Sequence, residues 1–352
     1  MSQHFKAAVL VEQRQPLAIL TLQIPDTLYV GQVLVQIKYS GICGSQICEQ
    51  DGVKGPDKYL SHCMGHEGGA VVQAVGPGVR NLRPGDHVVV HWRKGTGIEA
   101  DPPKYYCPEL CRDVGGGAAT TFQEYSVVSE NRLTKIDKDI PLDVAALMGC
   151  AVTTGLGVVA NELGIKMGQS VVVLGCGGVG LNVLQGASLV TAFPIIGVDI
   201  TEEKLRPATV MGATTAINNS FPTQEGLSFP AYIKKLTNGG ADFVIDTTGR
   251  PAVMKQAWEL AGPKGKVCFV AQLRHDTFLS LQTLPMHQGR TLMGSDGGAT
   301  DPTNDIPRYL KLFKAGRLNL RELITHRTKL RDVNSMLDLI RTGVVGRAVI
   351  EL

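Results

Sequence analysis

The segment SGICGSQICEQDG, which begins at Ser40, places two thiols and a hydroxyl close together. Cys43 and Cys48 are residues that can bind a soft metal ion, and Ser45 lies between them. Two cysteines alone do not make a metal site, because most single cysteines in proteins are small buried side chains. The segment therefore has two interpretations, metal-assisted chemistry and core packing.

A glycine-rich motif, VVVLGCGGVGLNVLQGASL, follows an apolar run later in the chain. Gly175, Gly177 and Gly180 give the pattern G-x-G-x-x-G between an expected strand and an expected helix, the context that a dinucleotide-binding motif requires. The first glycine permits a tight turn, the second lets the backbone approach a pyrophosphate, and the third lets the helix pack against the strand. The helix N-terminus would then offer free N–H groups to the phosphates.

The next apolar run, IIGVDI, places Asp199 about 24 residues after Gly175, near the spacing expected for a ribose-binding acid. A carboxylate there would accept hydrogen bonds from both ribose hydroxyls and repel a 2′-phosphate, which favours NAD over NADP. A surface charge at the end of a strand is the alternative for Asp199. Lys204, one helical turn further on, is either a second ribose contact or a solvated surface lysine.

The composition predicts two domains. The chain has 352 residues, of which 43% are hydrophobic and 19% are charged. The net charge of +3, without clusters of basic and aromatic residues, gives no reason to expect nucleic acid as a partner. We find neither a secretory signal nor an apolar run of about 18 residues, so we expect no membrane partner, a cytoplasmic location and reduced cysteines.

The pattern of apolar runs changes along the chain. Up to about residue 150, short strand-like runs such as GDHVVVHW alternate with Gly and Pro turns, which favours an antiparallel, barrel-like domain. From Thr153, the runs SVVVLG, PIIGVDI, ADFVIDTTG and GKVCFVA alternate with helical patterns, which predicts a doubly wound parallel sheet. We therefore expect an α/β protein with a Rossmann dinucleotide-binding domain at 153–294 and a catalytic domain at 1–152 and 295–352.

Seven motifs carry a resemblance that runs from about Phe5 to Leu352: GICGS, GHEGGAVV, VGPGV, RPGDHVV, GC…TTGLG, GCGGVG and VDI. In this order they are similar to those of the zinc-dependent medium-chain alcohol dehydrogenases. The resemblance implies a GroES-like catalytic domain beside the Rossmann domain and a homodimer or homotetramer. It also implies hydride transfer between NAD and a small alcohol or polyol, or the reverse reaction on an aldehyde or ketone.

The same resemblance implies that Cys43, His66 and Cys150 hold one catalytic zinc with a fourth position left open. Glu67 matches a carboxylate that approaches the zinc and eases ligand exchange, and a buried carboxylate paired with a distant arginine is its alternative. Ser45 matches the hydroxyl that takes the proton of the bound alcohol.

Three further positions follow from the resemblance. Thr154 and Val179 match residues that line the nicotinamide, and Arg347 matches an arginine that binds the pyrophosphate. Core packing for Val179 and a surface position for Arg347 are the alternatives.

The chain departs from the family pattern in the region between His91 and Glu124. Many members hold a second, structural zinc there with four cysteines, whereas this chain offers only Cys107 and Cys111. Two thiols cannot complete a tetrahedral structural site, so we predict no structural zinc. Free thiols are the simplest interpretation of Cys107 and Cys111, and a disulfide between them is the alternative, which a reducing cytosol disfavours.

Two smaller departures concern the proton path. Gln46 replaces an acid that orients the zinc-bound histidine, and we expect its amide to accept a hydrogen bond from His66. Cys48 replaces a relay histidine, and a thiol with a pKa of about 8.5 is a poor base at neutral pH. We therefore expect the proton to leave through the cofactor ribose, and turnover to rise toward alkaline pH.

Two other functions stay open on the sequence. One is a zinc-free, NADPH-dependent quinone or enone reductase of the same superfamily, and the other is a non-catalytic nucleotide-binding or structural protein, as the crystallin relatives are. Cys43, His66, Cys150 and Asp199 together argue against the reductase, and the intact ligand set argues against the non-catalytic protein. For the substrate, the sequence favours a secondary alcohol or a sugar-like polyol.

Overall fold

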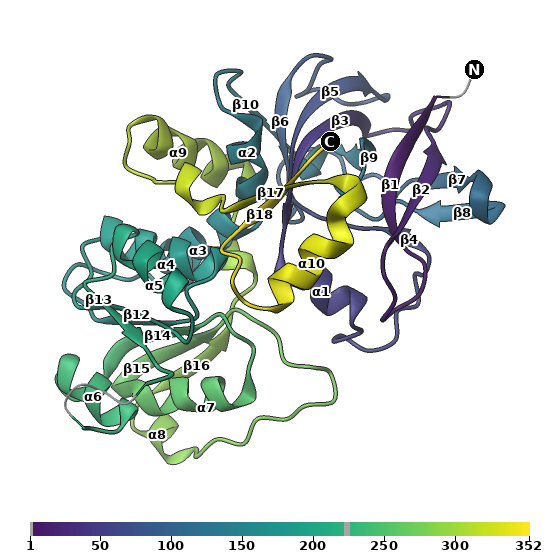
Figure 1. Ribbon diagram of the computed structural model, residues 1–352. Helices are drawn as coiled ribbons and strands as arrows, with labels where there is room; N and C mark the ends of the chain where they lie inside the picture. Colours follow the sequence, from purple (N-terminus) through teal and green to yellow (C-terminus); the bar gives the residue numbers. More distant parts are fainter. Residues whose placement is uncertain (1–2, 222–225) are drawn as a thin grey trace. The chain divides into compact units, whose positions relative to one another are not determined.

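The computed structural model describes residues 3–221 and 226–352. The chain forms two compact units (Figure 1), the first made of Met1–Ala151 with Asp301–Leu352 and the second of Val152–Thr300. The expected boundaries lay after residues 152 and 294. The second unit therefore continues beyond its last strand, through the helical turn Gly297–Ala299, before the chain returns to the first unit.

The first unit is built on two sheets whose strands pair mostly antiparallel. Its larger sheet has the order β10 (Leu133–Ile136), β6 (His87–Val90), β5 (Gly68–Val75), β3 (Gln32–Ile42), β18 (Ala348–Glu351) and β17 (His326–Lys329), with β9 (Tyr125–Ser129) also paired to β3. Its smaller sheet has the order β2 (Ala18–Gln23), β1 (His4–Leu10), β4 (His62–Cys63), β8 (Arg112–Gly115) and β7 (Lys104–Cys107). Alternate residues of β3, namely Val33, Val35 and Ile37, are buried in one core, as a period of two requires.

Four helices complete the first unit: α1 (Gly44–Gln50), α2 (Leu142–Met148), α9 (Pro302–Lys314) and α10 (Val333–Arg341). Helix α2 lies against β5 so closely that a Cβ at Gly69 would come within 1.9 Å of the Leu142 carbonyl oxygen. The mostly antiparallel architecture confirms the expected domain class.

The second unit is a six-stranded parallel sheet with helices on both faces (Figure 1). Its strand order is β13 (Thr215–Asn218), β12 (Ile195–Asp199), β11 (Val171–Leu174), β14 (Ala241–Asp246), β15 (Ala261–Phe269) and β16 (Thr291–Gly294). The strand order reverses direction between β11 and β14, which is the point at which open α/β sheets bind ligands. The doubly wound parallel sheet is therefore confirmed.

The helices of the second unit are α3 (Ala151–Gly157, beginning at the unit boundary), α4 (Gly178–Leu189), α5 (Glu202–Val210), α6 (Phe229–Leu236), α7 (Pro251–Leu260) and α8 (Leu284–His287). Short helical turns occur at Pro108–Leu110, Glu130–Arg132, Val158–Glu162, Gly297–Ala299, Arg321–Leu323 and Leu330–Asp332. Among the described residues no single helix has the length and apolar character to cross a membrane, and the bent pair Leu142–Met148 and Ala151–Glu162 meets that test by length and composition alone.

Candidate metal and nucleotide sites

The first unit brings together the three residues that the resemblance assigned to a metal. The ligand atoms of Cys43, His66 and Cys150 all lie within 4.8 Å of one another. Cys43 is the N-cap of α1, His66 lies between β4 and β5, and Cys150 follows α2. Three segments far apart in sequence therefore place two sulfurs and an imidazole around one point.

Gly149 explains how Cys150 reaches this point. A Cβ at Gly149 would lie 2.4 Å from the Val90 carbonyl oxygen and 2.7 Å from the Cα of Glu67. Any side chain there would push the end of α2 away from β6 and from the His66–Glu67 segment. The glycine is therefore required for the third ligand to approach the other two.

The three residues change one another's pKa values. A hydrogen bond with the Cys150 thiol lowers the pKa of Cys43 well below its usual value, although burial opposes this shift. The same hydrogen bond, together with burial, raises the pKa of Cys150. Burial alone would lower the pKa of His66, but its contact with Cys43 raises it. The sulfurs and the imidazole are the donors that zinc prefers, and zinc would displace the protons that remain.

Gln46 connects two members of the set. Its side-chain oxygen accepts a hydrogen bond of 2.9 Å from the backbone N–H of Cys43, and its amide nitrogen faces Nδ1 of His66. We expected the amide to accept from His66; the structure instead places the amide nitrogen there, because the oxygen serves the start of α1. An amide N–H directed at Nδ1 leaves the proton of the neutral ring on Nε2, so metal binding through Nε2 would require the amide to turn and accept from Nδ1–H.

Glu67 and Arg347 form an ion pair close to the ligands. Glu67 is 0% exposed and Arg347 is 5% exposed. Burial raises the pKa of Glu67, although Arg347 opposes this shift. The buried carboxylate paired with a distant arginine, the alternative for Glu67, is thus what the structure shows. The pyrophosphate contact of Arg347 stays a prediction.

Two buried oxygens near these residues have no hydrogen-bond partner in the described part of the chain: Oε2 of Glu67 and Oγ of Ser45. Buried polar atoms are normally satisfied, so these two oxygens are available to a ligand. The donor set and these two oxygens together fit zinc and a substrate hydroxyl. Cys48 is a weaker candidate for a proton acceptor near neutral pH, because burial, and then the neighbouring Cys43, raise the pKa of its thiol.

The glycine motif lies between β11 and α4, as predicted. Gly175 has a φ of +94°, a conformation that favours glycine, and a Cβ at Gly180 would lie 1.9 Å from the Gly175 carbonyl oxygen. Gly177 is the N-cap of α4, and nothing lies within 4 Å of its Cβ position. The motif therefore has a tight turn, a close helix–strand contact and open space at the start of a helix.

Asp199 ends β12 beside this turn. Its carboxylate accepts hydrogen bonds of 2.8 Å from the N–H of Cys176, 2.8 Å from Ile200 and 3.0 Å from Thr201. These three bonds hold a negative group next to the glycine motif. Lys204 lies half-buried in the first turn of α5.

The two residues expected along the nicotinamide lie on neighbouring helices. A Cβ at Gly155 would lie 2.8 Å from the Val179 carbonyl oxygen, so α3 and α4 are in close contact. Thr154 is buried in α3, and Val179 is half-buried in the first turn of α4. Their contacts to a cofactor stay predictions.

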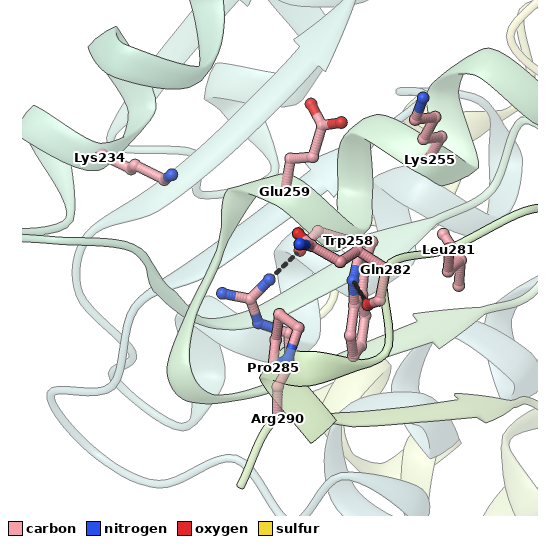
Figure 2. Close-up of a pocket in the computed structure, with 8 residues that line it drawn as sticks. All are labelled: Lys234, Lys255, Trp258, Glu259, Leu281, Gln282, Pro285 and Arg290. Carbon is pink, nitrogen blue, oxygen red and sulfur yellow. Dashed lines mark hydrogen bonds between the residues drawn. The ribbon is translucent and has the colours of Figure 1, made fainter. Parts of the chain in front are cut away.

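A separate cavity of about 220 Å³ lies in the second unit (Figure 2). The residues that line it are Lys234, Lys255, Trp258, Glu259, Leu281, Gln282, Pro285 and Arg290. The guanidinium of Arg290 stacks on Trp258, 5.0 Å from the ring centre, and donates to the carbonyl oxygens of Trp258 and Gly262. None of the predicted cofactor residues lines this cavity, and its arginine already serves the fold.

Sequence reasoning missed one cluster of potential ligands in the first unit. The ligand atoms of Glu49, Asp57 and His62 also lie within 4.8 Å of one another. No motif marks them, because their proximity depends on the path of the loop between α1 and β4.

Comparison with known families identifies the class of protein. Residues 30–138 match the alcohol dehydrogenase GroES-like domain, and residues 178–315 match the zinc-binding dehydrogenase domain. The chain therefore belongs to the zinc-dependent medium-chain dehydrogenase family.

Individual relatives span the whole chain. Alcohol dehydrogenase class-3 of Caenorhabditis elegans is 31% identical and covers 98% of this chain and 96% of its own. S-(hydroxymethyl)glutathione dehydrogenase of Paracoccus denitrificans is 30% identical over 98% of this chain and 99% of its own. The crystal structure of benzyl alcohol dehydrogenase from Acinetobacter calcoaceticus superposes with a TM-score of 0.86 at 26% identity, covering 99% of both chains. These comparisons confirm an oxidoreductase of the alcohol dehydrogenase type.

Proposed function

We propose that the chain is an NAD-dependent zinc alcohol dehydrogenase. Its substrate is a secondary alcohol or a sugar-like polyol, and the reverse reaction reduces the corresponding ketone or aldehyde. The observation that carries the proposal is the convergence of Cys43, His66 and Cys150 within 4.8 Å, in the same unit as the unpartnered hydroxyl of Ser45.

The residues of the first unit would have separate roles in the reaction. Cys43, His66 and Cys150 would hold zinc, which when bound acts as a Lewis acid on a substrate oxygen while NAD accepts the hydride. Ser45 Oγ would take the proton of the substrate hydroxyl while releasing its own proton toward the cofactor ribose. Gln46 holds His66 and the start of α1 together, and Cys48 stays protonated near neutral pH because its pKa is raised.

We assign the cofactor preference to Asp199. Its three backbone hydrogen bonds fix the carboxylate beside the glycine motif, where it would accept the ribose hydroxyls of NAD and repel the 2′-phosphate of NADP. Thr154 and Val179 would flank the nicotinamide. The chain would work as a homodimer or homotetramer, as its resemblance implies.

We also propose one catalytic zinc per chain and no zinc held by the cysteines between His91 and Glu124. The region between His91 and Glu124 contributes only Cys107, which is buried, and Cys111, which is exposed. No four-cysteine set is available in that region.

The test combines metal analysis with a substrate screen. The purified chain is assayed under NAD with alcohols and sugars, including benzyl alcohol and S-(hydroxymethyl)glutathione, and NADH is followed by absorbance. Turnover that is lost on chelation, and in Cys43→Ser and Cys150→Ser, supports the proposal. NADPH-dependent enone reduction that survives chelation would instead indicate the zinc-free reductase. NADH binding without turnover on any substrate would indicate a non-catalytic protein.

A further inference from the structure

The cluster of Glu49, Asp57 and His62 shares no residue with the catalytic set. Nε2 of His62 lies 2.8 Å from Oδ2 of Asp57 and 3.9 Å from Oε1 of Glu49. The side chains of His62 and Asp57 are only 10% and 13% exposed, whereas that of Glu49 is 38% exposed. The cluster is thus enclosed on two sides and reachable from solvent at Glu49.

Both ring nitrogens of His62 face oxygen atoms. Nδ1 lies 2.9 Å from the backbone carbonyl oxygen of Cys63, which can only accept, so Nδ1 carries a proton. A neutral ring then directs the bare lone pair of Nε2 at the carboxylate of Asp57, 2.8 Å away. A proton or a metal ion therefore has to lie between these two atoms.

The surroundings orient the ligand atoms toward a common point. A histidine whose other N–H bonds a backbone carbonyl is typical of metal ligation, because that bond fixes the tautomer and the ring. The other oxygen of Asp57, Oδ1, accepts a hydrogen bond of 2.8 Å from the N–H of Tyr59, which directs Oδ2 toward His62. A tetrahedral ion with bonds of about 2.0 Å separates its ligands by about 3.3 Å. To admit the ion, Nε2 and Asp57 Oδ2, now 2.8 Å apart, would separate by about 0.5 Å, and Glu49 Oε1, now 3.9 Å from Nε2, would approach by about 0.6 Å.

We propose that Glu49, Asp57 and His62 form a second divalent-cation site. One imidazole and two carboxylates suit Zn²⁺, or the chemically similar Co²⁺ and Ni²⁺, better than Ca²⁺ or Mg²⁺, which prefer oxygen ligands alone. The two negative charges balance the charge of the ion, and water would complete the coordination on the exposed side of Glu49.

The proposed ion would stabilise the positions of two catalytic ligands, Cys43 and His66. Glu49 lies in α1, the helix that Cys43 caps, and His62 lies in the strand that leads to His66. An ion that joins α1 to β4 would therefore restrain the two segments that carry these two ligands. The role of this ion would therefore be structural. The region between His91 and Glu124 offers only two cysteines and cannot supply a structural zinc site itself.

Cobalt loading of the full-length chain tests the site. Only cysteine-bound cobalt gives a thiolate-to-metal charge-transfer band, so the two sites have different spectra. The wild type is expected to bind about two Co²⁺ per chain, one with that band and one without it. Asp57→Asn and His62→Gln should keep the first ion and bind the second at least about tenfold more weakly.

Asp51→Asn is the matched control. It removes the same charge from the same segment, but Asp51 pairs with Arg341 and lies outside the cluster, so both ions should remain. If either main variant fails to fold, Glu49→Gln at the most exposed of the three positions gives the same readout.

Two results would overturn the proposal. One is a wild type that binds only the ion with the charge-transfer band, with nitrogen NMR showing a doubly protonated His62. The other is a second ion that persists in both Asp57→Asn and His62→Gln. The charge-transfer band reports the cysteine set separately, so a failure of the proposed function would be visible as the loss of that band.

Discussion

Asp199 shows how a single carboxylate is made ready for a ligand. All three of its hydrogen-bond donors are backbone N–H groups, from Cys176, Ile200 and Thr201. Two donors bond Oδ1 and one bonds Oδ2, so the carboxylate cannot rotate freely, while its remaining lone pairs can accept further hydrogen bonds. The fold thus pre-positions a negative group at the edge of the glycine motif.

Replacing Asp199 with alanine tests this role. Loss of charge-assisted hydrogen bonds of about 1.5–3 kcal/mol should lower kcat/KM for NAD by about 10- to 100-fold, mainly through KM. NADP should become a relatively better cofactor, because the repulsion of its 2′-phosphate is removed. Steady-state kinetics with both cofactors measure the change, and Glu203→Gln, an exposed acid of α5, is the control. An unchanged NAD to NADP ratio would show that Asp199 does not set the preference.

Cys48 gives a second prediction at this scale. Burial raises its pKa, and the nearby Cys43 adds to the shift, so the thiol stays protonated and cannot accept a proton near neutral pH. The turnover of the wild type should therefore rise toward alkaline pH. Cys48→His supplies a group with a pKa of about 6.5 and should move this rise to lower pH. The measurement is kcat from pH 6 to 10, and superimposable curves would exclude this position from the proton path.

At the scale of elements, close backbone approach decides where functional groups lie. The α4 helix starts beside β11 only because Gly180 lacks a Cβ, and α2 ends beside Glu67 only because Gly149 lacks one. The first contact places a helix N-terminus at the predicted phosphate position, and the second places Cys150 at the metal set. In both cases a glycine supplies the position, and a neighbouring residue supplies the chemistry.

Gly180 and Gly177 are a matched pair for testing this distinction. Gly180→Ala would put a methyl group 1.9 Å from the Gly175 carbonyl oxygen, so the free energy of unfolding should fall by about 1–3 kcal/mol. Gly177→Ala meets no atom within 4 Å and should keep its stability, but its methyl group would occupy the space expected for the pyrophosphate. Urea unfolding and NADH fluorescence titration separate the two effects. Equal loss of NADH affinity without any loss of stability in Gly180→Ala would contradict the packing argument.

How far the sequence predicts these features depends on how local they are. The glycine motif and Asp199 could be predicted because a strand, a turn and a helix in immediate succession define their geometry. Cys43, His66 and Cys150 come from three distant segments, so only the family resemblance linked them. Glu49, Asp57 and His62 have no motif, and the orientation of the Gln46 amide depends on which donor its oxygen meets.

At the scale of the whole molecule, the two kinds of chemistry belong to different units. The metal set and Ser45 lie in the first unit, which the chain completes only when it returns after Thr300. The glycine motif and Asp199 lie in the second. Arg347, whose partner Glu67 adjoins His66, comes from the returning segment, so the surroundings of the metal set depend on the folding of both pieces of the first unit.

The stability of the first unit in acid depends in part on a histidine that is buried directly after β6. His91 is 1% exposed; its Nδ1 lies 2.7 Å from the Arg93 carbonyl oxygen, and its Nε2 lies 2.9 Å from the Thr134 hydroxyl. The carbonyl can only accept, so Nδ1 donates and Nε2 accepts from Thr134, and the ring is satisfied when neutral. Burial lowers the pKa of His91 to about 4.

The unfolded chain, in which the pKa of this histidine is about 6.5, therefore binds more protons than the folded chain between pH 6.5 and 4. Stability should be retained above pH 6.5 and fall as the pH decreases through this window, by up to about 3 kcal/mol from this group. His91→Gln should unfold more easily at pH 7 and show a smaller loss between pH 7 and 4.5. The exposed His287→Gln is the control, and urea unfolding at several pH values gives the slopes. A His91→Gln slope equal to that of the wild type would show that the acid sensitivity arises elsewhere, with the buried Glu67–Arg347 pair as the next group to test.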